Sequence, residues 1–83
     1  MGTKNKVIAG DYSGANIMPV AGKVVLSISL GNMIILNKKT VAAHEIVSET
    51  QGKHRVSIQF VDGKKSLLEL DDKLFQMLIR DLF

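Results

Sequence analysis

The sequence predicts a small, mainly β (α+β) fold: an antiparallel sheet or partly open barrel of six to seven strands, capped by one C-terminal helix. Three observations predict it. Apolar and polar residues alternate in "LSISL" and "VSIQF", which is the period of a strand with one buried face. Glycine-containing turn signals separate such segments. After Asp71 the apolar residues change to the spacing of an amphipathic helix.

Length and composition limit the possibilities further. The 83 residues fit a single domain, residues 1–83. A chain of this size buries only about 60% of its unfolded surface, and without cysteine it has no disulfide or thiolate site to stabilise it. No apolar run approaches the roughly 18 residues of a membrane span. The basic start "MGTKNKV" lacks the apolar centre of a secretion signal, so we expect a cytoplasmic protein.

The first half of the chain reads as four short strands. Val7 to Tyr12 is the expected first strand, ended by the turn formers of "SGAN". "IMPV" is expected at a sheet edge, because Pro19 has no N–H to donate within a central strand. "MIILN" is expected as a short return strand after the turn "GN". Between these two lies a strand whose predicted buried face consists of Leu26, Ile28 and Leu30.

The segment "TVAAHEIVSET" is ambiguous. Its alternation is weak, and Ala42, Ala43 and Glu45 would tolerate a helix. The β-branched residues favour a strand instead; they are Val41, Ile46, Val47 and Thr50.

The hairpin around "VDG" allows a prediction of register. A three-residue loop, Val61–Gly63, pairs Phe60 with Lys64 and Val56 with Leu68, which keeps the apolar faces together. It needs a left-handed residue at its third position, where the sequence has glycine. A two-residue loop would place apolar residues opposite charged ones. The favoured register also pairs His54 with Leu70 and Arg55 with Glu69.

The last element is predicted to be a helix that covers the sheet. Asp71 is a suitable N-cap, and Asp72 in the first turn complements the helix dipole. Burying the apolar stripe would contribute on the order of 10 kcal/mol before the entropy of ordering is subtracted. The stripe consists of Leu74, Phe75, Leu78, Ile79, Leu82 and Phe83.

The sequence gives little support for catalysis. His44 and His54 lie on neighbouring predicted strands and could meet, but no third metal ligand has a suitable position. The register above places His54 beside the core, which favours a structural role. Capping accounts for Asp71 and Asp72. There is no cysteine nucleophile, no activated serine motif and no phosphate-binding glycine loop. We therefore predict a non-enzymatic protein without catalytic residues, metal or cofactor.

Nucleic acid is not an expected partner, because single-strand readers need aromatic platforms and this chain has one tyrosine and three phenylalanines. The net charge of +3 is concentrated in residues 1–40, where five lysines face one aspartate. Lysines at strand ends usually keep a small sheet soluble. A second interpretation is contact with anions, through lysines that cluster at predicted turns: Lys23, Lys38, Lys39, Lys64 and Lys65.

Several antiparallel strands followed by one helix resemble a reduced pleckstrin-homology-like barrel. The segments "VIAGDYSG", "LNKKTVAAHEIV" and "VSIQFVDGKKSLLELDDKLFQMLIRDLF" are similar to small, largely uncharacterised proteins of Gram-positive bacteria and their prophages. Many of those proteins carry a Gly- and Ala-rich apolar insert before the "VSIQF" strand, whereas here only "TQGK" stands there. Pleckstrin-homology-like folds host lipid-headgroup binding, peptide binding and scaffolding.

Two functions are compatible with these observations. The first is a module that binds a protein partner or itself, through the strand edges of a partly open barrel. The second is a peripheral binder of anionic surfaces, such as lipid headgroups, through the five turn lysines.

Overall fold

The computed structural model describes residues 5–29, 31–50 and 52–82. The mainly β prediction is confirmed: seven antiparallel strands precede one helix. Leu30 and Phe83, which the sequence assigned to the core, lie outside the described residues. The prediction that Ile28 is buried is wrong: it is exposed, at the point where the register between β3 and β4 shifts. The elements are β1 (Lys6–Gly10), β2 (Asn16–Val20), β3 (Lys23–Ser29), β4 (Asn32–Ile35), β5 (Val41–Thr50), β6 (Lys53–Phe60), β7 (Lys65–Leu70) and α1 (Asp72–Leu82).

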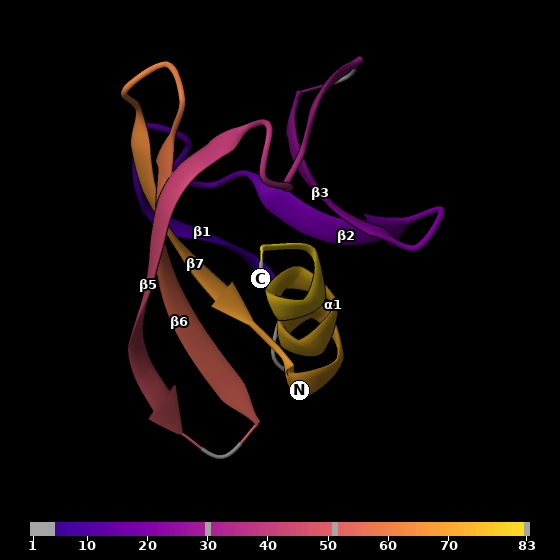
Figure 1. The fold of residues 1–83 in the computed structure, drawn as a ribbon, viewed down its shortest axis with the longest axis vertical. Helices are drawn as coiled ribbons and strands as arrows, with labels where there is room; N and C mark the ends of the chain where they lie inside the picture. The colour runs from indigo at the N-terminus through magenta and orange to yellow at the C-terminus, as the bar shows by residue number, and fades with distance from the viewer. Residues whose placement is uncertain (1–4, 30, 51, 83) are drawn as a thin grey trace.

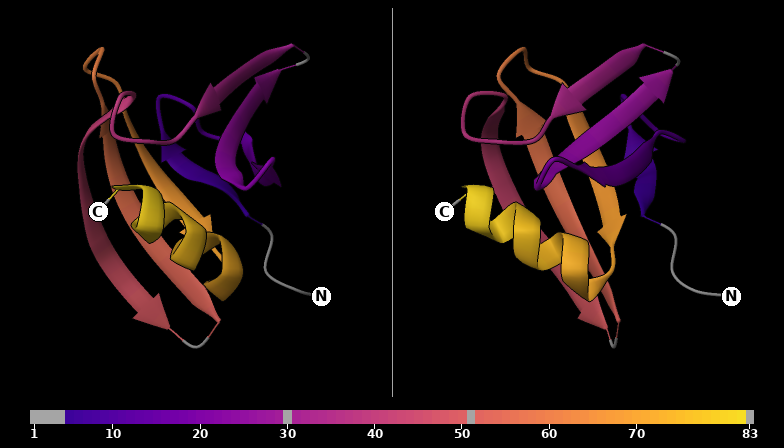
Figure 2. Two further views of the ribbon diagram at one scale, coloured as in Figure 1. Left: turned by 45° about the vertical axis from the view of Figure 1, so that its right-hand side comes forward. Right: turned by 90° about the vertical axis from the view of Figure 1, so that its right-hand side faces the viewer.

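The strands form one curled sheet in the order β4-β3-β2-β1-β7-β6-β5. The sheet has two halves, β2–β4 and β5–β7, and β1 joins them. β1 pairs with β7 over most of the length of β1, but with β2 only at Lys6 and Asn16. The sheet bends at this point, so that β2–β4 lie across from β5–β7, with α1 in the concave space between them (Figures 1 and 2). The result is a half-barrel with a helix cap, an arrangement consistent with a pleckstrin-homology-like fold.

The sequence predicted β2 at a sheet edge because Pro19 has no N–H to donate, and this prediction is wrong. The nitrogen of Pro19 nevertheless faces a side on which β2 forms no ladder hydrogen bond at this position. β2 lies between β1 and β3. Leu36 N donates to Val24 O over 2.9 Å, so the hydrogen-bonding groups of Val24 face β4. Pro19, which pairs with Val24, therefore points its nitrogen away from β3, toward the side where β1 pairs only with Asn16. No ladder hydrogen bond is lost there. The first strand also ends earlier than expected, at Gly10, and Tyr12 lies in the turn that follows.

The register predicted for the β6–β7 hairpin is confirmed. Val56 pairs with Leu68, and Phe60 N donates to Lys64 O over 2.7 Å, which closes the three-residue loop. Gly63 has φ +94°, the left-handed conformation that this loop requires. The pairs His54–Leu70 and Arg55–Glu69 are also present.

The ambiguous segment is a strand, β5. It pairs with β6 along its length, but the register shifts between Val41 and Ala43 and again between Ile46 and Ser48. Each β-bulge changes which residues face the core. The weak alternation of this segment follows from these two shifts.

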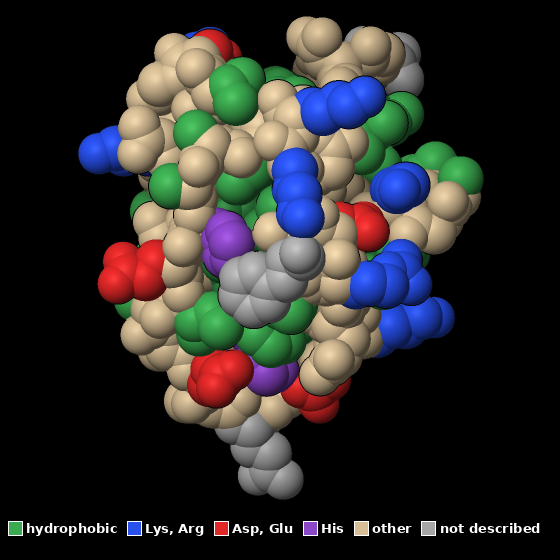
Figure 3. All heavy atoms as spheres, viewed as in Figure 1, with side chains coloured by type: hydrophobic (Ala, Val, Ile, Leu, Met, Phe, Trp, Pro, Cys, Tyr) green, Lys and Arg blue, Asp and Glu red, His purple; other side chains and the backbone are tan. Residues whose placement is uncertain are grey.

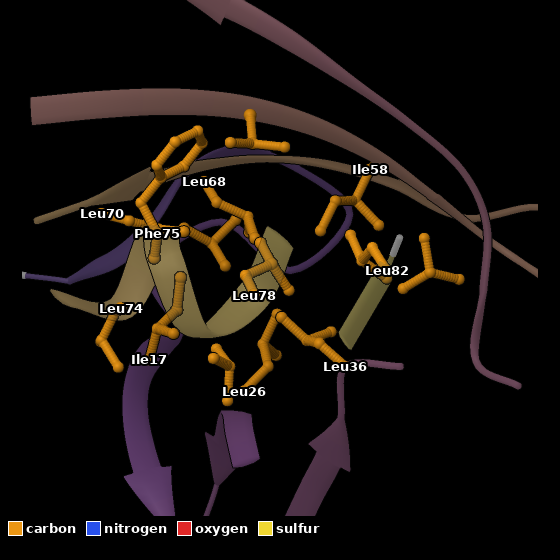
Figure 4. Close-up of a cluster of buried hydrophobic side chains, with 14 of the residues drawn as sticks. Ile17, Leu26, Leu36, Ile58, Leu68, Leu70, Leu74, Phe75, Leu78 and Leu82 are labelled. Atoms are coloured by element: carbon orange, nitrogen blue, oxygen red, sulfur yellow. The ribbon is translucent and has the colours of Figure 1, made fainter. Parts of the chain in front are cut away.

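Helix α1 is the cap that the sequence predicted. Leu74 N donates to Asp71 Oδ1 over 2.9 Å, which is the expected N-cap bond. The apolar stripe faces the strands, where it meets side chains of both halves of the sheet (Figure 4). Ile79 is only partly buried at its margin. The buried helix residues are Leu74, Phe75, Leu78 and Leu82. Within the described ranges, no helix has the length and apolar character needed to span a membrane.

Candidate functional site

The outer face of β2–β4 carries an apolar cluster that does not belong to the core. Val25 is only 3% exposed, yet it is absent from the core cluster inside the half-barrel. Its cross-strand partners are Met18 on β2 and Ile35 on β4, and all three share the face that points away from α1. The sequence predicted a polar face here from its serines, and this is wrong at Val25. We call this surface the outer β2–β4 face; it consists of Met18, Val20, Val25, Met33 and Ile35.

This face remains exposed at its border with the free edge of the sheet. Met33 is 58% exposed and Ile35 is 46% exposed, although both are large apolar side chains on β4. A contiguous apolar patch on the surface of a protein is typical of a contact surface. A signal was available in the sequence, because Lys23 is the only charged residue among residues 12–37. That depletion of charge falls on β2, β3 and β4 together.

The two edge strands of the sheet differ in how they are protected. β5 carries Glu45 and Glu49 and two bulges, and charges and bulges both discourage pairing with another chain. β4 contains no charged residue and no proline. Its one irregularity lies toward the β3–β4 turn, opposite Ser27 and Ser29. The β4 edge is protected mainly by its shortness, and it is the edge better suited to strand addition.

The five candidate lysines form two separate groups. Lys23, Lys38 and Lys39 line one shallow hollow of about 320 Å³, together with Asn37. Asn37 Oδ1 accepts a hydrogen bond from Lys39 N over 2.8 Å, so this loop has a defined shape. Lys64 and Lys65 belong to the β6–β7 hairpin and do not line this hollow. Figure 3 shows most of the visible basic side chains on one side of the molecule, and acidic ones mainly on the opposite side and at the lower end.

An aspartate at the end of α1 completes the hollow. Asp81 lines it beside the three lysines, and its side chain is only 12% exposed. Arg80 Nε lies 3.7 Å from Asp81 Oδ1, whereas Asp81 Oδ2 is buried and has no hydrogen-bond partner among the described residues. A carboxylate in the last turn is unfavourable with the helix dipole, and the Arg80 guanidinium beside it partly offsets this effect. Sequence analysis did not identify this residue, because it lies 42 positions from Lys39 in the chain.

Lys64, through its side chain, and Lys65, through its main-chain N–H, contact residues of the turn that follows β1. Lys64 Nζ lies 5.3 Å from the centre of the Tyr12 ring, which is within the range of a cation–π contact. Tyr12 in turn packs edge-on against Phe60, with ring centres 5.2 Å apart. Lys65 N donates to Asp11 Oδ2 over 2.8 Å. Tyr12 is therefore engaged in packing.

The two histidines do not pair across the sheet. His44 lies opposite Ile58, whereas His54 lies opposite Glu49. The His54 ring stacks on Phe75 of α1, with ring centres 4.0 Å apart and planes inclined by 4°. Its Nδ1 is 3.3 Å from Glu49 Oε2, and its Nε2 contacts Asp72 Oδ1.

These contacts give His54 a structural role: it connects the β5–β6 hairpin to the first turn of α1. They also correct the assignment of Asp72 to capping alone, because its carboxylate binds this imidazole.

A second shallow hollow, of about 450 Å³, lies beside β5 and β6. Within the described ranges, no group of three His, Asp or Glu side chains is placed to hold a metal ion. The second hollow is lined by Ala43, His44, Glu45, Ser57, Gln59 and Lys65.

Comparison of the chain with protein-family models, curated proteins and solved structures gives no match. The similarity to Gram-positive prophage proteins therefore stays a prediction. Two surfaces of the described structure are candidates for binding: the outer β2–β4 face with its open edge, and the hollow lined by Lys23, Lys38 and Lys39.

Proposed function

We propose that this chain is a non-enzymatic protein-interaction module, located in the cytoplasm, which binds a protein partner or a second copy of itself through β4. The observation that carries the proposal is that β4, an uncharged strand with no neighbouring strand on one side among the described residues, also exposes the apolar side chains of Met33 and Ile35. Strand addition uses both features: main-chain hydrogen bonds supply affinity, and side chains on one face supply specificity.

A photo-crosslinking amino acid in place of Met33 tests this proposal. We expect covalent adducts with protein in the cells that produce the chain, because this side chain borders the proposed contact. Val47 on β5 is the matched control, since it is 54% exposed against 58% for Met33 but lies on the charged, bulged edge. Adducts at neither position, or equally at both, would contradict the proposal.

A second candidate function is the binding of anionic surfaces. It is supported by the gathering of Lys23, Lys38 and Lys39 around one hollow, with Arg80 next to Asp81 in the last turn of α1. These four cations and Asp81 give a local formal charge of +3, from four positive groups and one negative group. An anionic lipid surface attracts such a cluster through long-range electrostatics, and salt weakens the attraction.

Pelleting with phosphatidylglycerol-containing vesicles tests the second candidate. The double substitution Lys38→Glu/Lys39→Glu is expected to weaken binding by at least ~30-fold at low salt, because each lysine near the surface contributes about 1 kcal/mol. Lys64→Glu/Lys65→Glu makes the same charge change outside the hollow and is the matched control. Absence of wild-type binding at low salt would remove this candidate, and equal losses in both variants would refute the assignment to the hollow.

A further inference from the structure

We propose that the partner of the β4 edge is a second copy of this chain, paired antiparallel with it through β4 about a two-fold axis. This inference rests on the proposed function and names its partner. The direction of the main-chain N–H and C=O groups of β4 supports it. Leu36 N donates to Val24 O, and alternation along a strand therefore turns the N–H and C=O groups of Met33 and Ile35 away from β3.

The outward groups on β4 are not all available. The hydroxyl of Thr40 donates to Ile35 O over 2.5 Å, which occupies one of the two lone pairs of that carbonyl. The N–H and C=O of Met33 and the N–H of Ile35 face the side on which β4 has no neighbouring strand among the described residues. Three groups and one spare lone pair can therefore receive a short added strand.

Symmetry and face parity restrict the register, and the cover of the exposed apolar side chains then selects one of the allowed pairings. Directly opposed residues of an antiparallel pair lie on the same face of the sheet, so the two-fold axis must pass through a residue rather than between residues. An axis at Ile34 pairs Met33 with the partner's Ile35, and the partner's Met33 with Ile35. These are outward-directed residues, so each pair exchanges two main-chain hydrogen bonds. An axis at Met33 would instead oppose Ile35 to the partner's Gly31 and leave its apolar side chain uncovered.

The same register explains why a copy is a suitable occupant. Met33 and Ile35 are the most exposed apolar residues of β4. Across the axis, Met33 of each copy covers Ile35 of the other. Lys38 and Lys39 follow the C-terminal end of β4, so in an antiparallel pair the lysines of the two copies lie at opposite ends. The pairing brings no like charges together, despite the net charge of +3 on each chain. A two-fold contact of this kind is self-complementary and closes at two subunits.

The expected association is weak and concentration-dependent, because β4 has only four residues and small interfaces are typical of transient contacts. Sedimentation equilibrium on the full chain measures it directly. We expect a monomer–dimer equilibrium that Met33→Lys/Ile35→Lys weakens by at least ~10-fold, since two new charges would then enter the interface on each side. Ile46→Lys/Val47→Lys on β5 is the matched control and is expected to leave the equilibrium unchanged.

A single cysteine tests the register in this cysteine-free chain. With the axis at Ile34, the two copies of Ile34→Cys face each other at a Cα separation of about 4.5 Å, which a disulfide can span. We expect this variant to form a covalent dimer on mild oxidation much faster than Val47→Cys. Both variants are first compared with wild type by thermal unfolding under reducing conditions, so that misfolding is distinguished from loss of pairing.

The outcomes separate this inference from the proposed function. A chain that stays monomeric at all concentrations, while the crosslinker at position 33 captures a different protein, overturns the dimer and leaves the interaction module in place. A monomer without adducts overturns both. A dimer that Met33→Lys/Ile35→Lys leaves intact, or that crosslinks equally at positions 34 and 47, refutes pairing through β4.

Discussion

Replacing Leu78 by alanine is expected to lower the free energy of unfolding by about 3 kcal/mol or more. Leu78 is fully buried at the centre of the helix stripe, where side chains from both halves of the curled sheet meet (Figure 4). The truncation removes apolar contacts and leaves a cavity that a tightly curved sheet cannot easily close. In a chain of this size, that loss corresponds to a decrease in melting temperature of at least about 12 °C.

Phe75→Ala is expected to cost a similar amount for a partly different reason. Phe75 is buried, and its ring also stacks on His54, which contacts Glu49 and Asp72. The substitution removes both the buried ring and the surface that holds this imidazole. Lys73→Ala is the control, because Lys73 is exposed on the same helix, and its effect should stay within about 0.5 kcal/mol. Thermal and urea unfolding measure all three variants. Unchanged melting temperatures for both core variants would show that α1 does not hold the half-barrel together.

The elements that could be predicted from the sequence are those whose signals are local. The β6–β7 register follows from side-chain parity and one glycine, because a slip by one residue would expose the whole apolar face of a strand. Helix α1 is also specified by two independent signals, because its N-cap residue and its apolar stripe both predict a helix that begins directly after Asp71. In both cases a wrong alternative would bury charges or expose several apolar side chains, so the sequence excludes it.

The features that could not be predicted depend on neighbours that are distant in the sequence. The bulges of β5 shift its parity twice, and no single period describes such a strand. Whether Pro19 lies at an edge depends on how far β1 extends along β2, which the local sequence does not specify. The division of the lysines into two groups likewise could not be predicted without the topology, which decides which turns and loops are neighbours. Lys23 and Lys39 line the same hollow because the β2–β3 turn and the β4–β5 loop lie at the same end of the half-barrel.

The burial of Val25 is the most informative of these departures. Its parity with Ser27 predicts a solvent-facing position, but Met18 and Ile35 on the adjacent strands cover it. An apolar cluster outside the core contributes little to closing the half-barrel, so its presence beside the uncharged β4 edge favours a role in contact with another chain. For this reason β4, rather than the longer β5, carries the proposed interface.

Gly10→Ala is expected to destabilise the junction between the two halves of the sheet by about 2–6 kcal/mol, through backbone strain and steric overlap. Gly10 has φ +103°, and a Cβ built there would lie 2.4 Å from Lys65 O and 2.6 Å from the Cα of Ser66. Both are main-chain atoms of β7 and cannot move aside as a flexible side chain would. Asp11 N also donates to Lys65 O over 2.8 Å, so the displacement would disturb this bond as well.

Gly14→Ala separates the steric effect from the conformational one. Gly14 has φ +92°, but a Cβ there would meet no atom within 4 Å, so its substitution should cost only the strain of a left-handed residue, about 1–2 kcal/mol. Urea unfolding of the two variants measures the difference, and hydrogen exchange at Asp11 N–H should be accelerated in Gly10→Ala relative to Gly14→Ala. Equal losses of stability would mean that the close approach of β1 to β7 at Gly10 does not constrain the fold. In that case the β1–β7 pairing would not be what holds β2–β4 across from β5–β7, and other contacts would have to fix the position of the β4 edge.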